Sequence, residues 1–293
     1  MIRRIGVGDY IFMAFNGLFL TLVVVLTLYP FLFVFFASIS DPTEMARHMG
    51  FLVAPLGFSL GSYKMVLSNP MILAGYTNTL VYMSIGTVLN LLMTSLGAYV
   101  LSRKRVMLRN LIMFFIVFTM FFSGGLIPYY LVVRGLGLAN KMWALILPTA
   151  VSTYNLIIMR TSFAQIPDSM EESAKIDGAS DYRILFWIII PLAMPVVAVM
   201  ILFYSVGHWN SWFPAMIFLR TRERYPLQLV LREILIASST DSMTTDASSA
   251  DKEPIGETVK YATIMVATLP ILFVYPFLQR YFIKGIMIGA LKE

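Results

Sequence analysis

Charged residues and cysteine are what this sequence has least of. Only 13% of its 293 residues are charged, against about a quarter in a typical soluble domain. There is no cysteine, which excludes disulfides, thiolate metal sites and cysteine nucleophiles. The two histidines are too few to indicate a metal cluster. The chain also lacks the G-x-x-x-x-G-K-[ST] phosphate loop of many ATPases. Most metal, redox and nucleotide chemistry is therefore not expected of this chain.

Long apolar runs are what the sequence has in abundance, with 58% hydrophobic residues. A membrane-spanning helix needs about 20 largely apolar residues. The first run extends from Tyr10 to Ser38, too long for the apolar core of a signal peptide, so we expect a retained span. The sequence predicts an all-α membrane protein with six spans, at about 10–38, 72–101, 110–133, 142–160, 184–214 and 259–279.

The distribution of Lys and Arg predicts the orientation of these spans. The densest basic cluster, Arg103 to Arg109, lies in a short loop, and short loops rich in Lys and Arg stay in the cytoplasm. Both termini and the 161–183 loop are then cytoplasmic. The net charge of +6 is explained by such flanking residues, so we expect no nucleic-acid partner. We see no internal repeat and expect one transmembrane domain over 1–293.

Two polar connections are expected on the outer side. The stretch from Ser238 to Glu257 is rich in Ser, Thr and Asp and poor in aromatic residues, which predicts a flexible loop. The stretch from Phe51 to Asn69 is rich in Gly, Pro and Ser and predicts a second outer connection. Near the first of these, Arg220, Arg222 and Arg224 could attract an anionic solute or a partner protein, or could be ordinary solvated charges.

The polar segment between the fourth and fifth runs predicts two short helices with a hinge. Ser169 and Glu172 have the spacing of a capping box, and Pro167 ends the preceding span. The helix should end at Asp177-Gly178, where glycine can adopt the left-handed conformation. A new helix should start near Ser180 or Asp181. Helical spacing would place four residues on one docking face: Met170, Ser173, Ala174 and Asp177.

This segment resembles the cytoplasmic loop of permease subunits in binding-protein-dependent ATP-driven importers. Glu172, Ser173, Ala174 and Gly178 match the spacing E-A-A-x3-G, and Ile188 and Pro191 match the continuation x9-I-x-L-P. Ser replaces the second Ala and Ile190 replaces Leu, both modest departures. An ordinary solvated loop is the alternative interpretation.

The resemblance covers nearly the whole chain. Six runs, Trp209-Asn210 and the tail from Gln279 to Gly285 look like the smaller permease of maltose-type carbohydrate importers. The opening Val7–Phe12 and the Tyr29-Pro30-Phe31 sequence look like the branch that imports acidic oligosaccharides such as alginate. The resemblance implies the type I ABC importer permease fold in a bacterial inner membrane. It also implies coupling residues Ser169, Met170, Glu172, Ser173, Ala174, Asp177 and Gly178, and tail contacts at Lys284, Gly285 and Gly289.

The implied partners are a second permease, an ATP-binding subunit dimer, a solute-binding protein, a carbohydrate substrate and membrane lipid. ATP and Mg²⁺ would bind to the partner ATPase, and this chain would carry no cofactor and no catalytic residue. A permease for another solute is the main alternative. An ion-coupled carrier is less favoured because three of the runs contain no ionisable Asp, Glu, Lys or Arg. An integral-membrane enzyme would need a nucleophile–base pair or metal cluster in the spans, which we do not find.

Aromatic, amide and hydroxyl groups that could line a sugar path cluster at two places. They are Tyr76, Asn78 and Asn90 in the second run, and Trp209, Asn210 and Trp212 beyond the fifth. The alternative for the tryptophans is an aromatic belt at the membrane interface. We expect His208 to lie with these aromatics at the outer end of the span.

Overall fold

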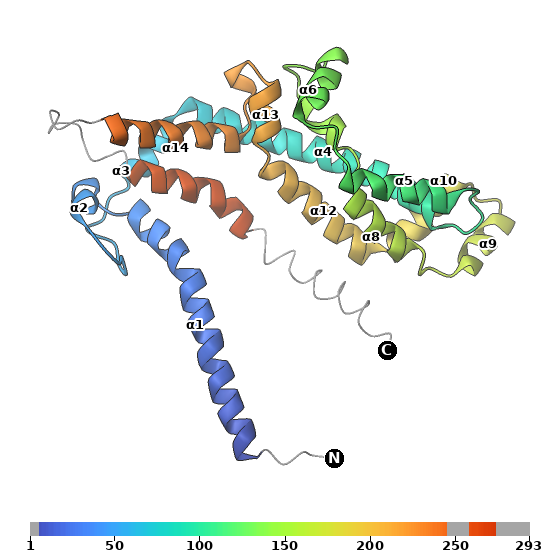
Figure 1. The fold of residues 1–293 in the computed structure, drawn as a ribbon, viewed down its shortest axis with the longest axis horizontal. Helices are drawn as coiled ribbons and strands as arrows, with labels where there is room; N and C mark the ends of the chain where they lie inside the picture. The colour runs from blue at the N-terminus through green and yellow to red at the C-terminus, as the bar shows by residue number, and fades with distance from the viewer. Residues whose placement is uncertain (1–5, 245–257, 274–293) are drawn as a thin grey trace. The chain divides into compact units, whose positions relative to one another are not determined.

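The computed structural model describes residues 6–244 and 258–273, and within these ranges the chain contains helices and no strand (Figure 1). The chain folds as two compact units, one formed by residues 1–69 and 233–268 and the other by 70–232 and 269–293. Each is described by itself, and the single domain expected over 1–293 stays a prediction.

The first unit contains α1 (Val7–Ser38), an apolar helix of 32 residues. It also includes α2 (Pro42–Arg47), α3 (Gly61–Ser68) and most of a helix at Thr258–Phe273. Within the unit, Phe33 of α1 packs edge-on against Tyr261, with ring centroids 5.7 Å apart. Ser62 of α3 donates a hydrogen bond of 2.8 Å to Thr258. The rest of α1 is exposed along most of its length, as expected of a helix that faces lipid or another subunit.

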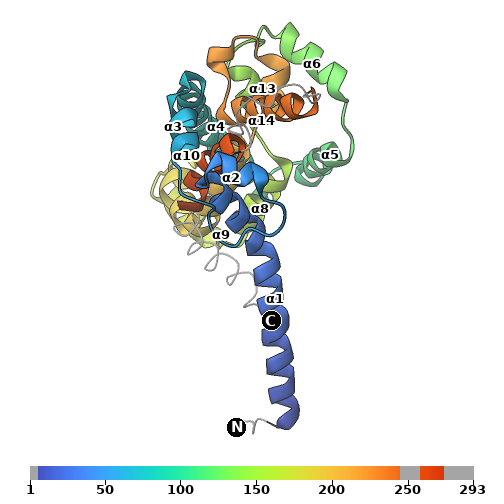
Figure 2. The same ribbon diagram turned by 90° about the vertical axis from the view of Figure 1, so that its left-hand side faces the viewer.

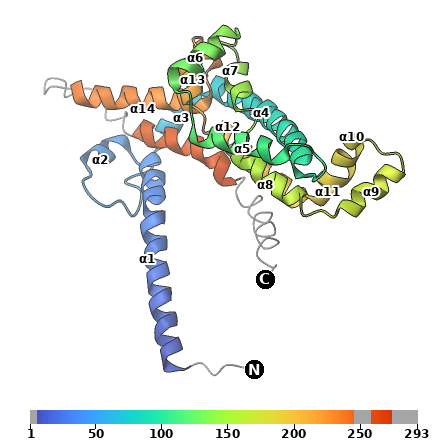
Figure 3. The same ribbon diagram turned by 45° about the vertical axis from the view of Figure 1, so that its right-hand side comes forward.

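The second unit is built on α4 (Pro70–Ser102). The helices α8 (Thr153–Phe163) and α12 (Met194–Trp209) pack along it and share one core of buried residues (Figures 1 and 3). The remaining elements are α5 (Arg109–Phe121), α6 (Leu126–Gly135), α7 (Trp143–Ile146), η1 (Leu147–Thr149), α9 (Asp168–Ile176), α10 (Asp181–Ile184), η2 (Leu185–Ile189), α11 (Ile190–Leu192), α13 (Phe213–Phe218), η3 (Arg222–Arg224) and the start of α14 (Leu227–Thr244).

The predicted spans at 10–38 and 72–101 are single helices, and both are long and apolar enough to cross a membrane. Three others are interrupted. The 110–133 run bends by 115° between α5 and α6, at Ser123-Gly124-Gly125 (Figure 2). The 142–160 run divides into α7, η1 and α8, because Pro148 ends the first helix and Ser152 caps the next. If each bent pair is one span, the described residues contain up to four.

The 184–214 run is also two helices in place of one. The helix Asp181–Leu192 meets α12 at an angle of 89°, with Ala193 between them. Pro191 cannot donate the backbone hydrogen bond of a continuous helix, and a π-helical turn, η2, precedes it. Pro195 lies in the first turn of α12, where its missing N–H is tolerated. The predicted start of the helix at Ser180 or Asp181 is confirmed, since Ser180 is the N-cap of α10.

The polar stretch after Ser238 differs from the prediction. The helix α14 continues through it to Thr244, so the expected loop is wrong for residues 238–244, and residues 245–257 lie outside the described part. The apolar first turns of α14 extend the helix into the polar residues, because adding a residue to an existing helix is easier than starting one. The other expected connection, 51–69, contains the helix α3.

Candidate functional site

The polar segment between α8 and α10 folds as the helix α9 (Asp168–Ile176). The predicted capping box is wrong. Pro167 is the N-cap residue, and no side chain caps the helix. Because the helix starts two residues earlier than predicted, Ser169 lies inside its first turn and is too far along to cap it. The carboxylate of Asp168, also in the first turn, is stabilised by the positive end of the helix dipole.

The C-terminal end of α9 confirms the prediction for Gly178. This residue has φ +80°, the left-handed region that glycine adopts most readily. Its N–H donates to the carbonyl of Lys175 at 3.0 Å, and the N–H of Ala179 donates to the carbonyl of Ala174 at 2.9 Å. These two bonds form a Schellman motif, which satisfies carbonyls at the helix end. The motif fixes the angle at which the chain leaves α9.

The four residues expected on one docking face are divided between two environments. Met170, Ser173 and Asp177 are exposed, whereas Ala174 is buried at 9% exposure against the core shared by α4, α8 and α12. Ala174 is therefore wrongly placed on the docking face. Glu172, also predicted for coupling, is exposed, as is Ser169. The surface available to a partner is the polar side of α9, and the small residue serves the packing of its own chain.

Glu171 is a buried, charged residue of this segment that the sequence interpretation missed. It is only 4% exposed, although it is a carboxylate on a short polar helix. Its Oε2 lies 3.1 Å from Nε of Arg103, and its Oε1 lies 2.6 Å from Arg105 and 2.8 Å from Lys175. The basic cluster from Arg103 to Arg109 could have indicated a buried carboxylate partner, but the sequence interpretation used it only to predict the orientation of the spans.

Two more carboxylates complete this charge cluster. Asp168 lies 3.5 Å from Arg103, and Asp181 lies 3.1 Å from Arg105 and 3.2 Å from Lys175. Three cations therefore face three carboxylates, and the cluster joins the loop after α4 to α9 and α10. The α9–α10 hairpin lies at one end of the second unit (Figures 1 and 3).

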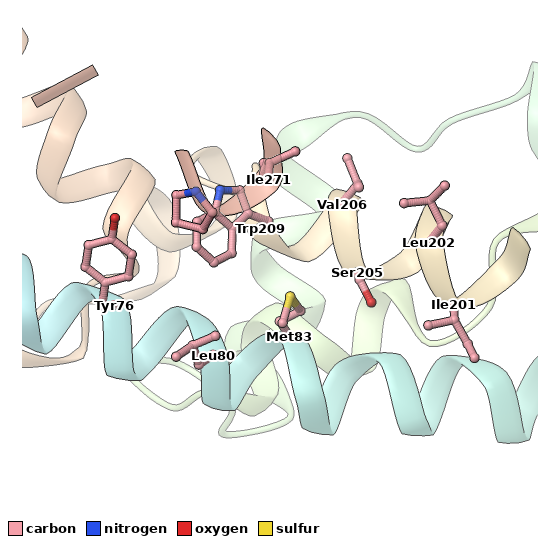
Figure 4. Close-up of a pocket in the computed structure, with 10 residues that line it drawn as sticks. Tyr76, Leu80, Met83, Ile201, Leu202, Ser205, Val206, Trp209 and Ile271 are labelled. Atoms are coloured by element: carbon pink, nitrogen blue, oxygen red, sulfur yellow. The ribbon is translucent and has the colours of Figure 1, made fainter. Parts of the chain in front are cut away.

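Two of the expected path residues meet in a cavity of about 450 Å³ between α4 and α12. The rings of Tyr76 and Trp209 lie edge to face, with centroids 6.1 Å apart. Apolar side chains such as Leu80 and Met83 form most of the remaining wall (Figure 4). The indole N–H of Trp209 is buried with no hydrogen-bond partner in the part of the chain that the structure describes. The cavity offers few groups for sugar hydroxyls.

Two other expected path residues bind their own chain. Asn78 donates to the carbonyls of Glu223 and Tyr225, at 2.6 and 3.1 Å. Trp212 stacks under the guanidinium of Arg232, whose Cζ lies 4.4 Å from the ring centroid. The contacts of Asn78 hold the segment around η3 against α4, and the contact of Trp212 joins the start of α13 to α14.

Asn90 and His208 join α4 and α12 by a buried polar contact. The amide of Asn90 donates to the carbonyl of Thr149 at 2.5 Å, and its Oδ1 lies 2.7 Å from Nε2 of His208. Gly86 makes room for the imidazole, because a Cβ there would lie 2.9 Å from its Cδ2. His208 was expected among the aromatics at the outer end, but it points into the α4–α12 contact. Asn210 ends α12 and is exposed. The expected tail contacts Lys284, Gly285 and Gly289 lie outside the described residues.

Comparison with known proteins identifies the family. The model for the binding-protein-dependent transport system inner membrane component matches residues 92–288. This chain belongs to that family. The permease is 41% identical to the polygalacturonan/rhamnogalacturonan transport system permease protein YtcP of Bacillus subtilis, over 94% of its own length and 96% of the relative's. It is 42% identical to the protein LplC of the same organism, over 94% and 93% of the two chains.

A solved structure extends the comparison to three dimensions. A chain of a bacterial ABC transporter involved in the import of the acidic polysaccharide alginate superposes with a TM-score of 0.86 and 33% identity. The match covers 94% of the permease and 98% of that chain. The predicted permease fold and the predicted class of transport subunit are confirmed. The permease is accordingly a membrane component of a transport system.

Proposed function

We propose that this permease forms one half of the channel of an ATP-driven importer whose substrate is an acidic oligosaccharide or polysaccharide. The observation that carries the proposal is the exposed side of α9. A polar helix of nine residues and its C-cap expose Met170, Ser173 and Asp177, while the other side of the helix is held by its own chain. A rigid, exposed helix between two membrane segments is suited to receive the movement of a partner ATPase.

The partners follow from the family and from what this chain lacks. With no phosphate loop of its own, the permease depends on an ATP-binding dimer, where ATP and Mg²⁺ bind. A second permease completes the channel, and a solute-binding protein delivers the substrate. The Lys and Arg distribution supports cytoplasmic termini in a bacterial inner membrane, with α9 on the cytoplasmic side.

Two observations support an acidic carbohydrate. YtcP is named for polygalacturonan and rhamnogalacturonan, and the superposed transporter for alginate, and all three polymers contain uronic acids. Arg220, Arg222 and Arg224, at and beside η3, are exposed and add positive charge to one surface. Such charge would attract a polyanion. Direct contact of the sugar with Tyr76 or Trp209 stays a prediction.

Reconstitution tests this function. The permease is combined in proteoliposomes with its second permease, its ATPase dimer and its solute-binding protein, and ATP hydrolysis and uptake are measured. Galacturonate oligomers and alginate oligomers should stimulate both, and neutral malto-oligosaccharides of equal length should not. Stimulation by another solute class would refute the acidic-carbohydrate assignment and leave the importer intact. Uptake without ATP, driven by an ion gradient, would refute the importer itself.

A further inference from the structure

Two adjacent glutamates on α9 have opposite environments. Glu172 is exposed, whereas Glu171 is 4% exposed and is surrounded by three cations. Successive residues on a helix point about 100° apart, since a turn takes 3.6 residues. One carboxylate therefore faces outward, and its neighbour faces the permease's own spans.

Arg103 is the buried cation that forms an ion pair with Glu171. It follows directly on Ser102, the last residue of α4, and is 4% exposed. Besides its ion pairs with Glu171 and Asp168, its guanidinium donates a hydrogen bond to the carbonyl of Phe163, the last residue of α8, at 3.4 Å. Its Cζ lies 5.2 Å from the centroid of the Tyr99 ring. One buried side chain thus touches the ends of α4 and α8 and the body of α9.

We propose that Arg103 and Glu171 form an internal latch that transmits the movement of α9 to α4. This proposal rests on the proposed function, in which a partner ATPase moves α9. The chain links on both sides of α9 are short, through Ile166-Pro167 on one side and Ala179-Ser180 on the other. A buried ion pair to the end of α4 gives the force a direct route to the helix that packs along α8 and α12.

The more exposed residues of the cluster, Arg105, Lys175 and Asp181, contribute less to the proposed latch. Arg105 and Lys175 share Glu171 Oε1 and Asp181 Oδ1, and the side chains of Arg105 and Asp181 are 52% and 61% exposed. Exposed ion pairs are screened by salt and contribute little. Arg103 and Glu171 have side-chain exposures of 5% and 6%, so removing either one takes the buried partner from the other and leaves it paired only with more exposed residues. Both are positioning residues that act through the helices they join.

The test measures transport per ATP hydrolysed in the complete reconstituted importer. The variants are Glu171→Gln and Arg103→Gln, each checked for co-purification of the ATPase subunits. We expect wild-type-like assembly and a loss of more than tenfold in transport per ATP. Lys104→Gln is the matched control, because it removes an exposed charge from the same loop, and it should keep the wild-type ratio. Transport per ATP within twofold of wild type in assembled Glu171→Gln would overturn the latch.

A covalent substitute covers the case in which the charge variants fail to assemble. The chain has no cysteine, so Arg103→Cys combined with Glu171→Cys introduces the only two thiols. We expect a short bifunctional thiol reagent that bridges them to restore transport per ATP, and the same reagent on either single variant to leave it low. Bridging without recovery would overturn the proposal. A wild-type permease with no solute-stimulated ATPase activity would instead refute the proposed function.

Discussion

The end of α9 offers a perturbation whose size can be worked from the structure. Gly178 has φ +80°, and a Cβ built at this position meets no atom of the described residues within 4 Å. A side chain there would clash with no neighbour, so the strain of the backbone is the whole effect. The left-handed conformation costs an L-residue roughly 1–2 kcal/mol, and asparagine tolerates it better than other residues. A β-branched residue is a genuine outlier there.

These magnitudes predict a graded series at position 178. A strain of about 1–2 kcal/mol shifts an equilibrium by a factor of roughly 5–30. Gly178→Ala should therefore lower the population of the Schellman end, and with it solute-stimulated ATPase activity and transport, by about that factor. Gly178→Asn should stay close to wild type. Gly178→Val should abolish transport while membrane abundance stays near wild type, because a Cβ at this position meets none of the described residues within 4 Å.

The assay compares the four proteins at equal membrane abundance in proteoliposomes with the complete importer. Gly135→Ala is the matched control, since a Cβ at that glycine also meets nothing within 4 Å but its φ is not positive. It should behave as wild type. Equal activity of the Ala and Asn variants, or normal transport by the Val variant, would refute the argument that the left-handed end of α9 orients the coupling helix.

Three further changes test other parts of the site. Because no side chain caps α9, Glu172→Gln and Glu172→Ala should weaken ATPase co-purification to the same extent, and an effect of Ala alone would point back to helix stability. Trp209→Ala should lower transport per molecule with basal ATPase activity unchanged if the indole lines the path. Reduced membrane abundance with normal transport per molecule would identify it as an anchor. Gly86→Ala should displace the His208 ring and lower thermal stability in detergent by about 1–3 kcal/mol, whereas Gly207→Ala, where a Cβ has free space, should not.

Apolar length predicted the parts of the fold that depend on composition alone. The runs at 10–38 and 72–101 are continuous helices because no helix-breaking pair interrupts them, and Pro30 is accommodated inside α1. The breaks at Gly124-Gly125 and Ala193 were missed because a hydropathy window averages over a proline or glycine and registers only the apolar neighbours. In lipid such breaks are tolerated where other protein segments satisfy the freed backbone groups, and those neighbours are not visible in one sequence.

At the coupling segment, local chemistry was predictable and long-range chemistry was not. The left-handed end at Gly178 follows from a glycine after a polar helix, a signal contained in a few residues. The burial of Glu171 depends on Arg103, 68 positions earlier in the sequence, and two of the expected path residues, Asn78 and Trp212, depend on partners in η3, α14 and the loops beside them. Spacing rules describe one helix at a time, so they cannot decide which of two adjacent glutamates faces a distant arginine.

The arrangement around α9 would allow so short a helix to transmit force in the proposed importer. Nine residues are too few for a stable isolated helix in water. The Schellman end, the packing of Ala174 and the ion pairs of Glu171 all lie within the permease itself, so the helix does not depend on the ATPase for its conformation. A partner that binds a preformed helix spends none of its binding free energy on ordering that helix. The full difference in ATPase contact between open and closed states then remains to shift the transporter, and reversing a gate from 1:99 to 99:1 takes about 5.5 kcal/mol of it.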